Sequence, residues 1–354
     1  MDLEAKDAWR REFWRKLGAD EDSAARLFAL CTPLPWPASP IPPFSDEPHV
    51  AFYRALPVSG QGLYEKLAEA FPQLFFLPAA GLRQSPEWNA AVGRGETPAG
   101  PLPALTFPEG LALHLLPTPV GTLPALVCAA REDFERLVQL LAYRGEPLPV
   151  PPSMGATLVQ GLPNRTRFKA LEHRSATAPW LTFREAQKRS KALYQDRLVL
   201  AWDGPYSGVA AVPGLDERSW RHRSLTIRLA HEATHYLTVR VFARLGHTVL
   251  EELVADWVGL WQAFGDYPLE LAQRFLGVEG PGTFRPGGRL ANYRGTPPVS
   301  EAAFALLATA TARATETLAK VKTPAPPPMR LLVSLLSTSL EELAEGCMGT
   351  LEAA

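Results

Sequence analysis

The chain has 354 residues, 46% of them hydrophobic and 21% charged, and its 36 basic and 37 acidic side chains leave a formal net charge of −1. A chain of this length and composition can bury a substantial core and accommodate two domains. Charges of both signs are interspersed without a long basic block, so we expect no nucleic-acid partner.

The sequence shows no apolar segment that would target or anchor the protein. Its first 20 residues alternate charged and aromatic side chains, and its longest weakly polar run, 301–312, is shorter than the ~18 apolar residues of a membrane span. The three cysteines, Cys31, Cys128 and Cys347, form no CxxC pair, which fits a reducing compartment. We therefore expect a cytoplasmic protein without a membrane partner.

The first 150 residues mix helical and strand-like patterns. Apolar side chains recur at helical spacing in residues 5–17, 22–31, 61–71 and 131–143. Short apolar runs between the later helices are typical of strands, and prolines at 33–48 indicate an extended connection. We predict an α+β N-terminal domain over residues 1–150, of unassigned role, that ends at the proline cluster 147–152.

Residues 151–354 are predicted to form a second, mostly helical domain with a small β-sheet. Two apolar runs, 197–203 and 208–213, flank a Gly/Pro turn and predict a β-hairpin. Helical patterns then fill four segments: 217–245, 249–264, 301–321 and 330–345. Gly246 is the expected end of the first of them.

An HExxH motif lies inside the first of these helical segments, where residues 231–235 read His-Glu-Ala-Thr-His. Side chains four residues apart share one face of a helix, so His231 and His235 can converge on one ion at about 2.0–2.1 Å. Glu232 lies roughly 100° further round the helix, where it can take a proton from water at the metal's open position. The motif therefore predicts a zinc site with Glu232 as general base.

A catalytic zinc site needs a third protein ligand as well as an open position. The metzincin pattern HExxHxxGxxH is excluded, because Thr238 and Val241 occupy its glycine and third-histidine positions. The next helical segment offers a carboxylate instead, either Glu251 or Glu252.

The spacing of Thr248 and Glu251 favours Glu252 as this third ligand. Thr248 and Glu251 are three residues apart, as in a capping box, and this role would occupy Glu251. Glu252 then remains free to face the metal, with Glu251 as the alternative. Asp256 lies one turn further on the same face, where it can accept the second N–H of a ligand imidazole.

HExxH followed on the next helix by ExxxD resembles the gluzincin group of zinc metallopeptidases, of which thermolysin-like enzymes are the familiar case. The resemblance covers residues 231–256 and implies a zincin-like fold and one zinc ion. It implies roles for five residues: ligands His231, His235 and Glu252, general base Glu232 and orienting carboxylate Asp256. The segment between the motifs is shorter than in thermolysin-like enzymes, and Glu251 stands where they have asparagine. Substrate specificity therefore does not carry over.

Attack of water on a carbonyl leaves negative charge on its oxygen, which a hydrogen-bond donor stabilises. We predict Tyr293, in a glycine-rich loop, as this donor, with Arg289 and Tyr206 as alternatives. Arg289 can instead bind a substrate carboxylate. His222 lies nine residues before His231, off the face of the two ligands, and is expected to be structural.

The predicted protein is a zinc metallopeptidase that hydrolyses a peptide or amide bond in a peptide or protein substrate. One alternative is a zinc-dependent hydrolase or regulatory metalloprotein that acts on a non-peptide or a single protein target. The other is a helical interaction protein in which HExxH is coincidental.

Overall fold

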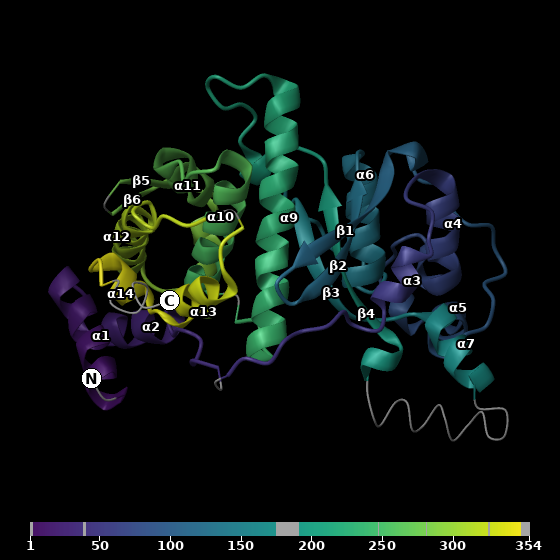
Figure 1. Cartoon of the computed structure of the whole chain (residues 1–354), viewed down its shortest axis with the longest axis horizontal. Helices are drawn as coiled ribbons and strands as arrows, with labels where there is room; N and C mark the ends of the chain where they lie inside the picture. Colours follow the sequence, from purple (N-terminus) through teal and green to yellow (C-terminus); the bar gives the residue numbers. More distant parts are fainter. Residues whose placement is uncertain are drawn as a thin grey trace. The chain divides into compact units, whose positions relative to one another are not determined.

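The computed structural model describes residues 3–37, 40–174, 191–246, 248–280, 282–324 and 326–347. They form two compact units, Pro43–Pro205 on the one hand and Met1–Pro42 with Tyr206–Ala354 on the other (Figure 1). The fold is α+β, as the sequence predicts. Among the described residues, no helix combines the length and the apolarity that crossing a bilayer requires.

The unit Pro43–Pro205 is built on a four-stranded sheet of order β1-β2-β4-β3. Its strands are β1 Leu111–Thr118, β2 Gly121–Cys128, β3 Ala156–Pro163 and β4 Gln195–Trp202. β1 and β2 form an antiparallel hairpin, β2 and β4 are parallel, and β3 is antiparallel to β4 with a bulge between Gln160 and Leu162.

Short helices complete this unit. The α-helices are α3 Val50–Arg54, α4 Gly60–Ala70, α5 Pro86–Trp88, α6 Arg131–Leu137 and α7 Arg165–Arg174. The 3-10 and π segments are η1 Pro72–Phe75, η2 Leu82–Gln84, η3 Asn89–Gly93, η4 Pro108–Gly110, η5 Val138–Ala142 and η6 Lys191–Leu193. Leu67 of α4, Phe134 of α6 and Leu200 of β4 belong to one buried apolar cluster, so helices and sheet share a core.

The other unit is mostly helical. Its helices are α1 Leu3–Leu17, α2 Glu21–Leu30, α9 Glu217–Phe242, α10 Val249–Phe264, α11 Leu269–Leu276, α12 Glu301–Leu318, α13 Met329–Ser337 and α14 Leu340–Ala344. The strands β5 Val278–Gly280 and β6 Thr283–Phe284 pair with each other, and η7 Tyr206–Gly208 and η8 Arg289–Tyr293 are 3-10 segments.

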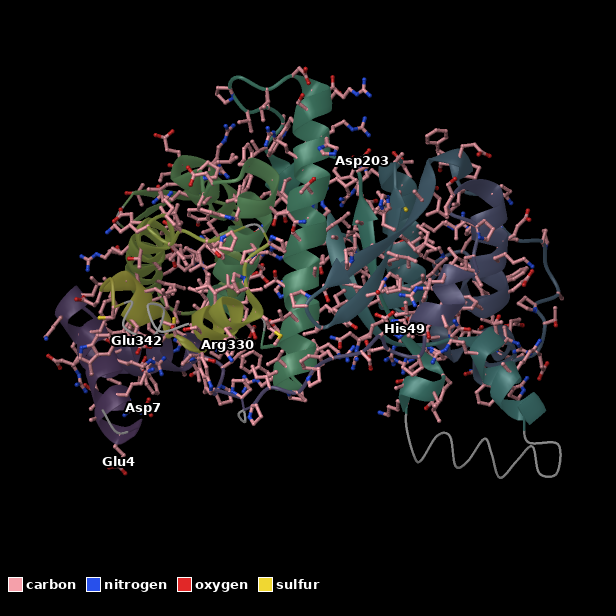
Figure 2. All side chains as sticks on the ribbon, in the orientation of Figure 1. Glu4, Asp7, His49, Asp203, Arg330 and Glu342 are labelled. Carbon is pink, nitrogen blue, oxygen red and sulfur yellow. The ribbon has the colours of Figure 1, made fainter. Side chains whose placement is uncertain are left out.

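The first helix belongs to this unit because it is tied to the last one. Arg10 Nε donates to Glu341 Oε2 at 3.1 Å, and Trp14 Nε1 donates to Glu341 Oε1 at 2.8 Å. At the surface, Lys6 Nζ lies 2.9 Å from the carboxylate of Glu342, which is labelled in Figure 2. Buried donors therefore satisfy the Glu341 carboxylate and join sequence positions far apart.

The units do not follow the predicted boundary after residue 150. β4 lies beyond that boundary, yet it pairs with β2 from before it, and Val199 is in register with Ala125. Residues up to Pro42, in turn, belong to the unit that begins again at Tyr206. The proline cluster at 147–152 is a connection inside one unit, because the sheet closes across it.

The predicted hairpin at 197–213 is wrong. β4 ends at Trp202 and pairs with β2 and β3, whereas residues 208–213 form no strand. Ser207 and Gly208 have φ values of 51° and 72°, in the left-handed region that an extended strand does not use. The chain turns sharply here and buries the side chain of Tyr206.

Gly246 does not end α9 as predicted. The helix ends at Phe242, and Ala243 takes the left-handed cap conformation with φ 56° while its N–H donates to Val239 O at 3.0 Å. The N–H of Gly246 donates instead to Glu251 Oε1 at 3.0 Å. The glycine thus takes part in the start of α10, which begins at Val249 as predicted.

Candidate metal centre

The centre is built on the long helix α9 and on α10, which follows it after a short loop. Asp216 caps α9 by accepting the N–H of Ser219 at 2.7 Å. α10 carries apolar side chains on every face, and all residues from 249 to 261 are buried. A short connection makes consecutive helices antiparallel neighbours, so the start of α10 lies beside the second half of α9.

Gly259 lets the two helices approach each other closely. A Cβ atom at this position would lie 2.7 Å from the carbonyl oxygen of Ile227, which is closer than real Cβ contacts. Ile227 is one turn before His231 on α9, and Gly259 follows Asp256 by three residues on α10. The point of closest approach therefore adjoins the predicted ligands on both helices.

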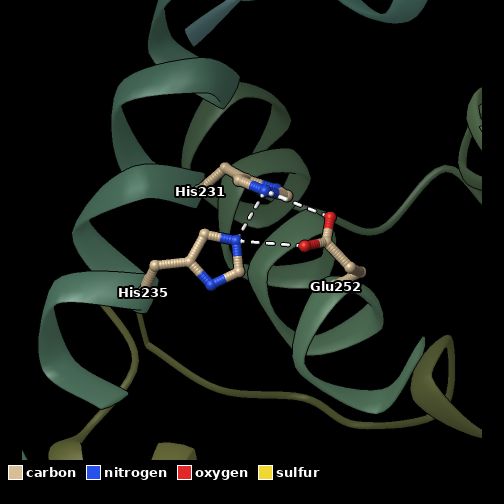
Figure 3. A group of neighbouring side chains, drawn as sticks. All are labelled: His231, His235 and Glu252. Atoms are coloured by element: carbon tan, nitrogen blue, oxygen red, sulfur yellow. Dashed lines mark hydrogen bonds and ion pairs between the residues drawn. The ribbon is translucent and has the colours of Figure 1, made fainter. Parts of the chain in front are cut away.

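The three predicted ligands come together in the interior (Figure 3). Nε2 of His235 lies 3.0 Å from Nε2 of His231 and 3.3 Å from Oε1 of Glu252, and Oε2 of Glu252 lies 3.5 Å from Nε2 of His231. Ligands bound to a tetrahedral zinc ion at about 2.05 Å lie about 3.3 Å from each other. This buried triangle of two imidazole nitrogens and a carboxylate fits a metal ion.

Glu251 is occupied by the start of α10, as its spacing from Thr248 predicts. Its carboxylate accepts the N–H of Gly246 at 3.0 Å and the N–H of Thr248 at 2.9 Å, while Thr248 Oγ1 accepts the N–H of Glu251. Both halves of the capping box are present. Of the two adjacent acids, Glu252 therefore faces the histidines.

Asp256 lies behind His231, on the side away from Nε2. Its Oδ1 is 2.9 Å from Nδ1 of His231, the position from which a carboxylate fixes the tautomer and the orientation of a ligand imidazole. Asp256 is 1% exposed. Its predicted place beside a ligand imidazole agrees with this geometry.

Two further residues hold Asp256. The hydroxyl of Tyr206 donates to Asp256 Oδ1 at 2.7 Å, and Arg289 donates to Asp256 Oδ2 and, at 3.1 Å, to the Tyr206 hydroxyl. Tyr206 belongs to η7 and Arg289 to η8, so two separate 3-10 segments contact α10 at Asp256. A buried carboxylate with two dedicated donors is held rigidly.

The charges of this network favour a cation at its centre. Burial alone would raise the pKa of Asp256, but Arg289 and His231 outweigh burial and hold that pKa at about 2. Burial likewise opposes ionisation of Glu252, yet its hydrogen bonds to the two histidines keep its pKa well below the usual value.

The pKa of His231 reflects the same negative charges. Burial would lower its pKa, but the hydrogen bonds and negative charges of Asp256 and Glu252 raise it to about 10. Carboxylates that stabilise a proton on this imidazole also stabilise a divalent cation in its place, and metal binding releases such a proton.

Glu232 differs from the other buried acids of this unit. It is 7% exposed and makes no hydrogen bond or ion pair with any described residue. Glu251, Glu252, Asp256 and Glu341, by contrast, are all paired. Its carboxylate is therefore free for a proton or a ligand.

The three candidates for oxyanion stabilisation have different neighbours in the structure. Tyr293 lies near Glu252, and burial together with the negative charge of Glu252 raises its pKa. Tyr206 and Arg289 both donate to Asp256, while Nη2 of Arg289 also lies 3.9 Å from Oε2 of Glu252. His222 is exposed and is not part of the cluster.

Fold and site together define an α+β protein with a buried two-histidine, one-glutamate cluster. The chain belongs to a family of unknown function (DUF7005), whose model matches residues 36–346 and so covers most of both units. Neither the curated proteins nor the solved structures contain a match to this chain.

Proposed function

We propose that the protein is a zinc-dependent metallopeptidase that hydrolyses a peptide or amide bond. The observation that carries the proposal is the close approach of the three candidate ligands. Nε2 of His235 lies 3.0 Å from Nε2 of His231 and 3.3 Å from Oε1 of Glu252, and Nε2 of His231 lies 3.5 Å from Oε2 of Glu252. Two imidazoles and one glutamate are a ligand set of catalytic zinc sites, which keep one position open.

Glu232 supplies the second part of the proposal. Zinc at this site would polarise a substrate carbonyl and lower the pKa of water. Glu232 follows a ligand directly in sequence, is buried and lacks a partner among the described residues. In this proposal it takes the proton from the attacking water and returns it to the leaving amine.

The remaining residues position these groups. With a metal bound, Asp256 would accept the N–H of Nδ1 of His231 and leave Nε2 as the nitrogen that binds the ion. Tyr293, near Glu252, is the proposed donor to the oxygen that gains negative charge during attack. A site of two histidines and one carboxylate also supports oxygen chemistry with iron. Hydrolysis is favoured because Glu232, next to a ligand in sequence and without a partner among the described residues, suits proton transfer.

Metal analysis of the purified protein tests the site. We expect one zinc ion per chain in the wild type and loss of zinc in His235→Ala and Glu252→Ala. The matched controls His222→Ala and Glu270→Ala alter exposed residues of the same types, and both should retain zinc. Iron in place of zinc, or zinc retained without His235, would contradict the proposal.

Cleavage of a denatured protein or a peptide library, read by mass spectrometry, tests the chemistry. Glu232→Gln should keep its zinc while its cleavage rate falls by about 10² or more, because it removes the proton acceptor. Glu217→Gln, an exposed position on the same helix, should cleave like the wild type. A zinc-loaded wild type that cleaves no peptide bond would overturn the peptidase assignment but leave the metal site standing.

A further inference from the structure

The unit Pro43–Pro205 contains a cavity that the proposed peptidase chemistry does not use. Its volume is about 410 Å³, within the range of small-molecule sites. Its lining comes from several elements, including η1, α5, η5, β3 and β4. β3 borders it at residues 158–163, where the strand bulges and Gly161 takes a φ of 68°. Bulges of this kind are frequent beside binding sites.

Much of the cavity wall is apolar and firmly packed. Trp88, Leu141 and Leu162 line it and are each at least 95% buried. The indole of Trp88 packs against Phe76 with a centroid distance of 5.4 Å, and Gly145 lies so close to Trp88 that an added Cβ would be 2.9 Å from the ring. The wall is therefore a fixed surface for a flat apolar group.

A buried amide in the lining has no hydrogen-bond partner among the described residues. Gln73 is 4% exposed, its Oε1 has no partner, and no described residue bonds to its side chain. Buried polar side chains are nearly always hydrogen-bonded, because an unsatisfied one keeps its desolvation cost. This amide is suited to an N–H or O–H group of a bound molecule.

Among the described residues of the lining, the charged side chains are both positive. Arg83 and Arg144 line the cavity with no aspartate or glutamate among those residues, and neither makes an ion pair or hydrogen bond with a described residue. Arg144 has a φ of 55°, a left-handed conformation that is unusual for a residue other than glycine and is often found at ligand sites. Two unpaired guanidinium groups favour an anion.

We propose that this cavity binds a small organic acid with a flat apolar body and an N–H or O–H group. The apolar body packs against Trp88, the N–H or O–H group donates to Gln73 Oε1, and the carboxylate pairs with Arg83 and Arg144. The site shares no residue with the metal centre, because its described lining residues belong to the unit Pro43–Pro205.

Indole-3-acetate is a suitable probe, because it combines an aromatic body, a ring N–H and a carboxylate. Isothermal titration should show one saturable site with a Kd on the order of 1 mM or lower, as its size allows. Tryptamine, which replaces the carboxylate by an ammonium group, should bind at least tenfold more weakly. Equal binding of the two, or no saturable binding of indole-3-acetate, overturns the proposal.

Variants assign the contacts. The double variant Arg83→Gln/Arg144→Gln should weaken the binding of indole-3-acetate at least tenfold, whereas Arg94→Gln, an exposed arginine outside the lining, should not. Methylation of the probe's ring nitrogen should weaken its binding several-fold in the wild type and not in Gln73→Leu. If Gln73→Leu shows the same preference for the unmethylated probe, the assigned role of Gln73 is wrong.

The titration is repeated in Glu252→Ala, which lacks a proposed metal ligand. Unchanged binding there places the probe away from the metal centre and supports the cavity. Loss of binding in that variant would mean that the carboxylate had been binding to the metal, and would overturn the proposal.

Discussion

Two buried aspartates, one in each unit, show how burial and hydrogen-bond donors compete. Asp196 of β4 is fully buried and Asp256 of α10 is 1% exposed. Burial raises the pKa of Asp196 to about 6, although the positive charge of Arg167 and the hydrogen bonds from Asn164 and Arg167 act to lower it. The pKa of Asp256 falls to about 2.

The difference lies in the charges around each carboxylate. Arg167 also donates to the carbonyl oxygens of Ala192 and Gln195, and the other donor to Asp196, Asn164, is neutral. Asp256 has Arg289 on one oxygen, with Tyr206 and the imidazole of His231 on the other. Burial alone therefore does not mark a site; in this chain, the carboxylate that is held ionised adjoins the candidate ligands.

Zinc binding should give the largest expected difference between the site that contains Asp256 and the surroundings of Asp196. Free zinc at about 1,000 times its Kd stabilises the folded protein by about 4 kcal/mol, because it binds the folded state. Thermal melting with zinc and with a chelator should show this stabilisation in the wild type and in Asp196→Asn. The stabilisation should disappear in His235→Ala, and an equal rise in melting temperature there would place the ion elsewhere.

The dependence of folding stability on pH should show the contribution of the raised pKa of Asp196. Its pKa is raised on folding, so the folded state binds the proton more tightly, and stability falls as pH rises from about 4 to about 6. The two-unit shift corresponds to at most about 3 kcal/mol. Denaturant unfolding at several pH values should show this fall in the wild type relative to Asp196→Asn; parallel curves for the two proteins would contradict it.

Asp256→Asn should weaken zinc binding by about 10- to 100-fold, or roughly 1.4–2.7 kcal/mol, because it removes the negative charge behind His231. Competition with a chromophoric chelator measures this. Asp196→Asn serves as the control and should bind zinc like the wild type. Equal zinc affinities for the two variants would remove the distinction drawn between the two aspartates.

Tyr206→Phe should produce the smallest effect of the series. It removes one donor from Asp256 and leaves Arg289 in place, so a loss of about 1 kcal/mol in zinc affinity is expected. The absorption spectrum of the cobalt-substituted protein should change as well, because the orientation of His231 depends on Asp256. Tyr53→Phe, at a buried tyrosine of the other unit, should leave both readouts unchanged.

Local spacing was enough to predict the helix pair and the cluster. Residues four apart on α9 and a capping box at the start of α10 depend only on neighbours in sequence, and they singled out Glu252 over Glu251. The spacing of Asp256 from Glu252 likewise predicted its place beside a ligand imidazole.

Contacts between distant segments could not be predicted in this way. No spacing rule relates Tyr206 or Arg289 to Asp256. The sequence therefore offered these two residues only as alternatives to Tyr293 and gave no sign that they donate to this carboxylate. The parallel pairing of β2 with β4 likewise spans the proline cluster that suggested a boundary. The Gly/Pro turn after β4 suggested a hairpin, but the left-handed residues that follow Tyr206 take the chain away from the predicted second strand.

The contact between Gly259 and Ile227 determines which parts of the centre can vary. Main-chain atoms of Ile227, together with its Cγ2, set the spacing of the helices there, so the opening between the imidazoles and the carboxylate depends little on the other core side chains. Apolar residues elsewhere along α10 can therefore be exchanged for others of similar volume while the opening keeps its width. At residue 259, however, even one methyl group would act as a wedge between the helices.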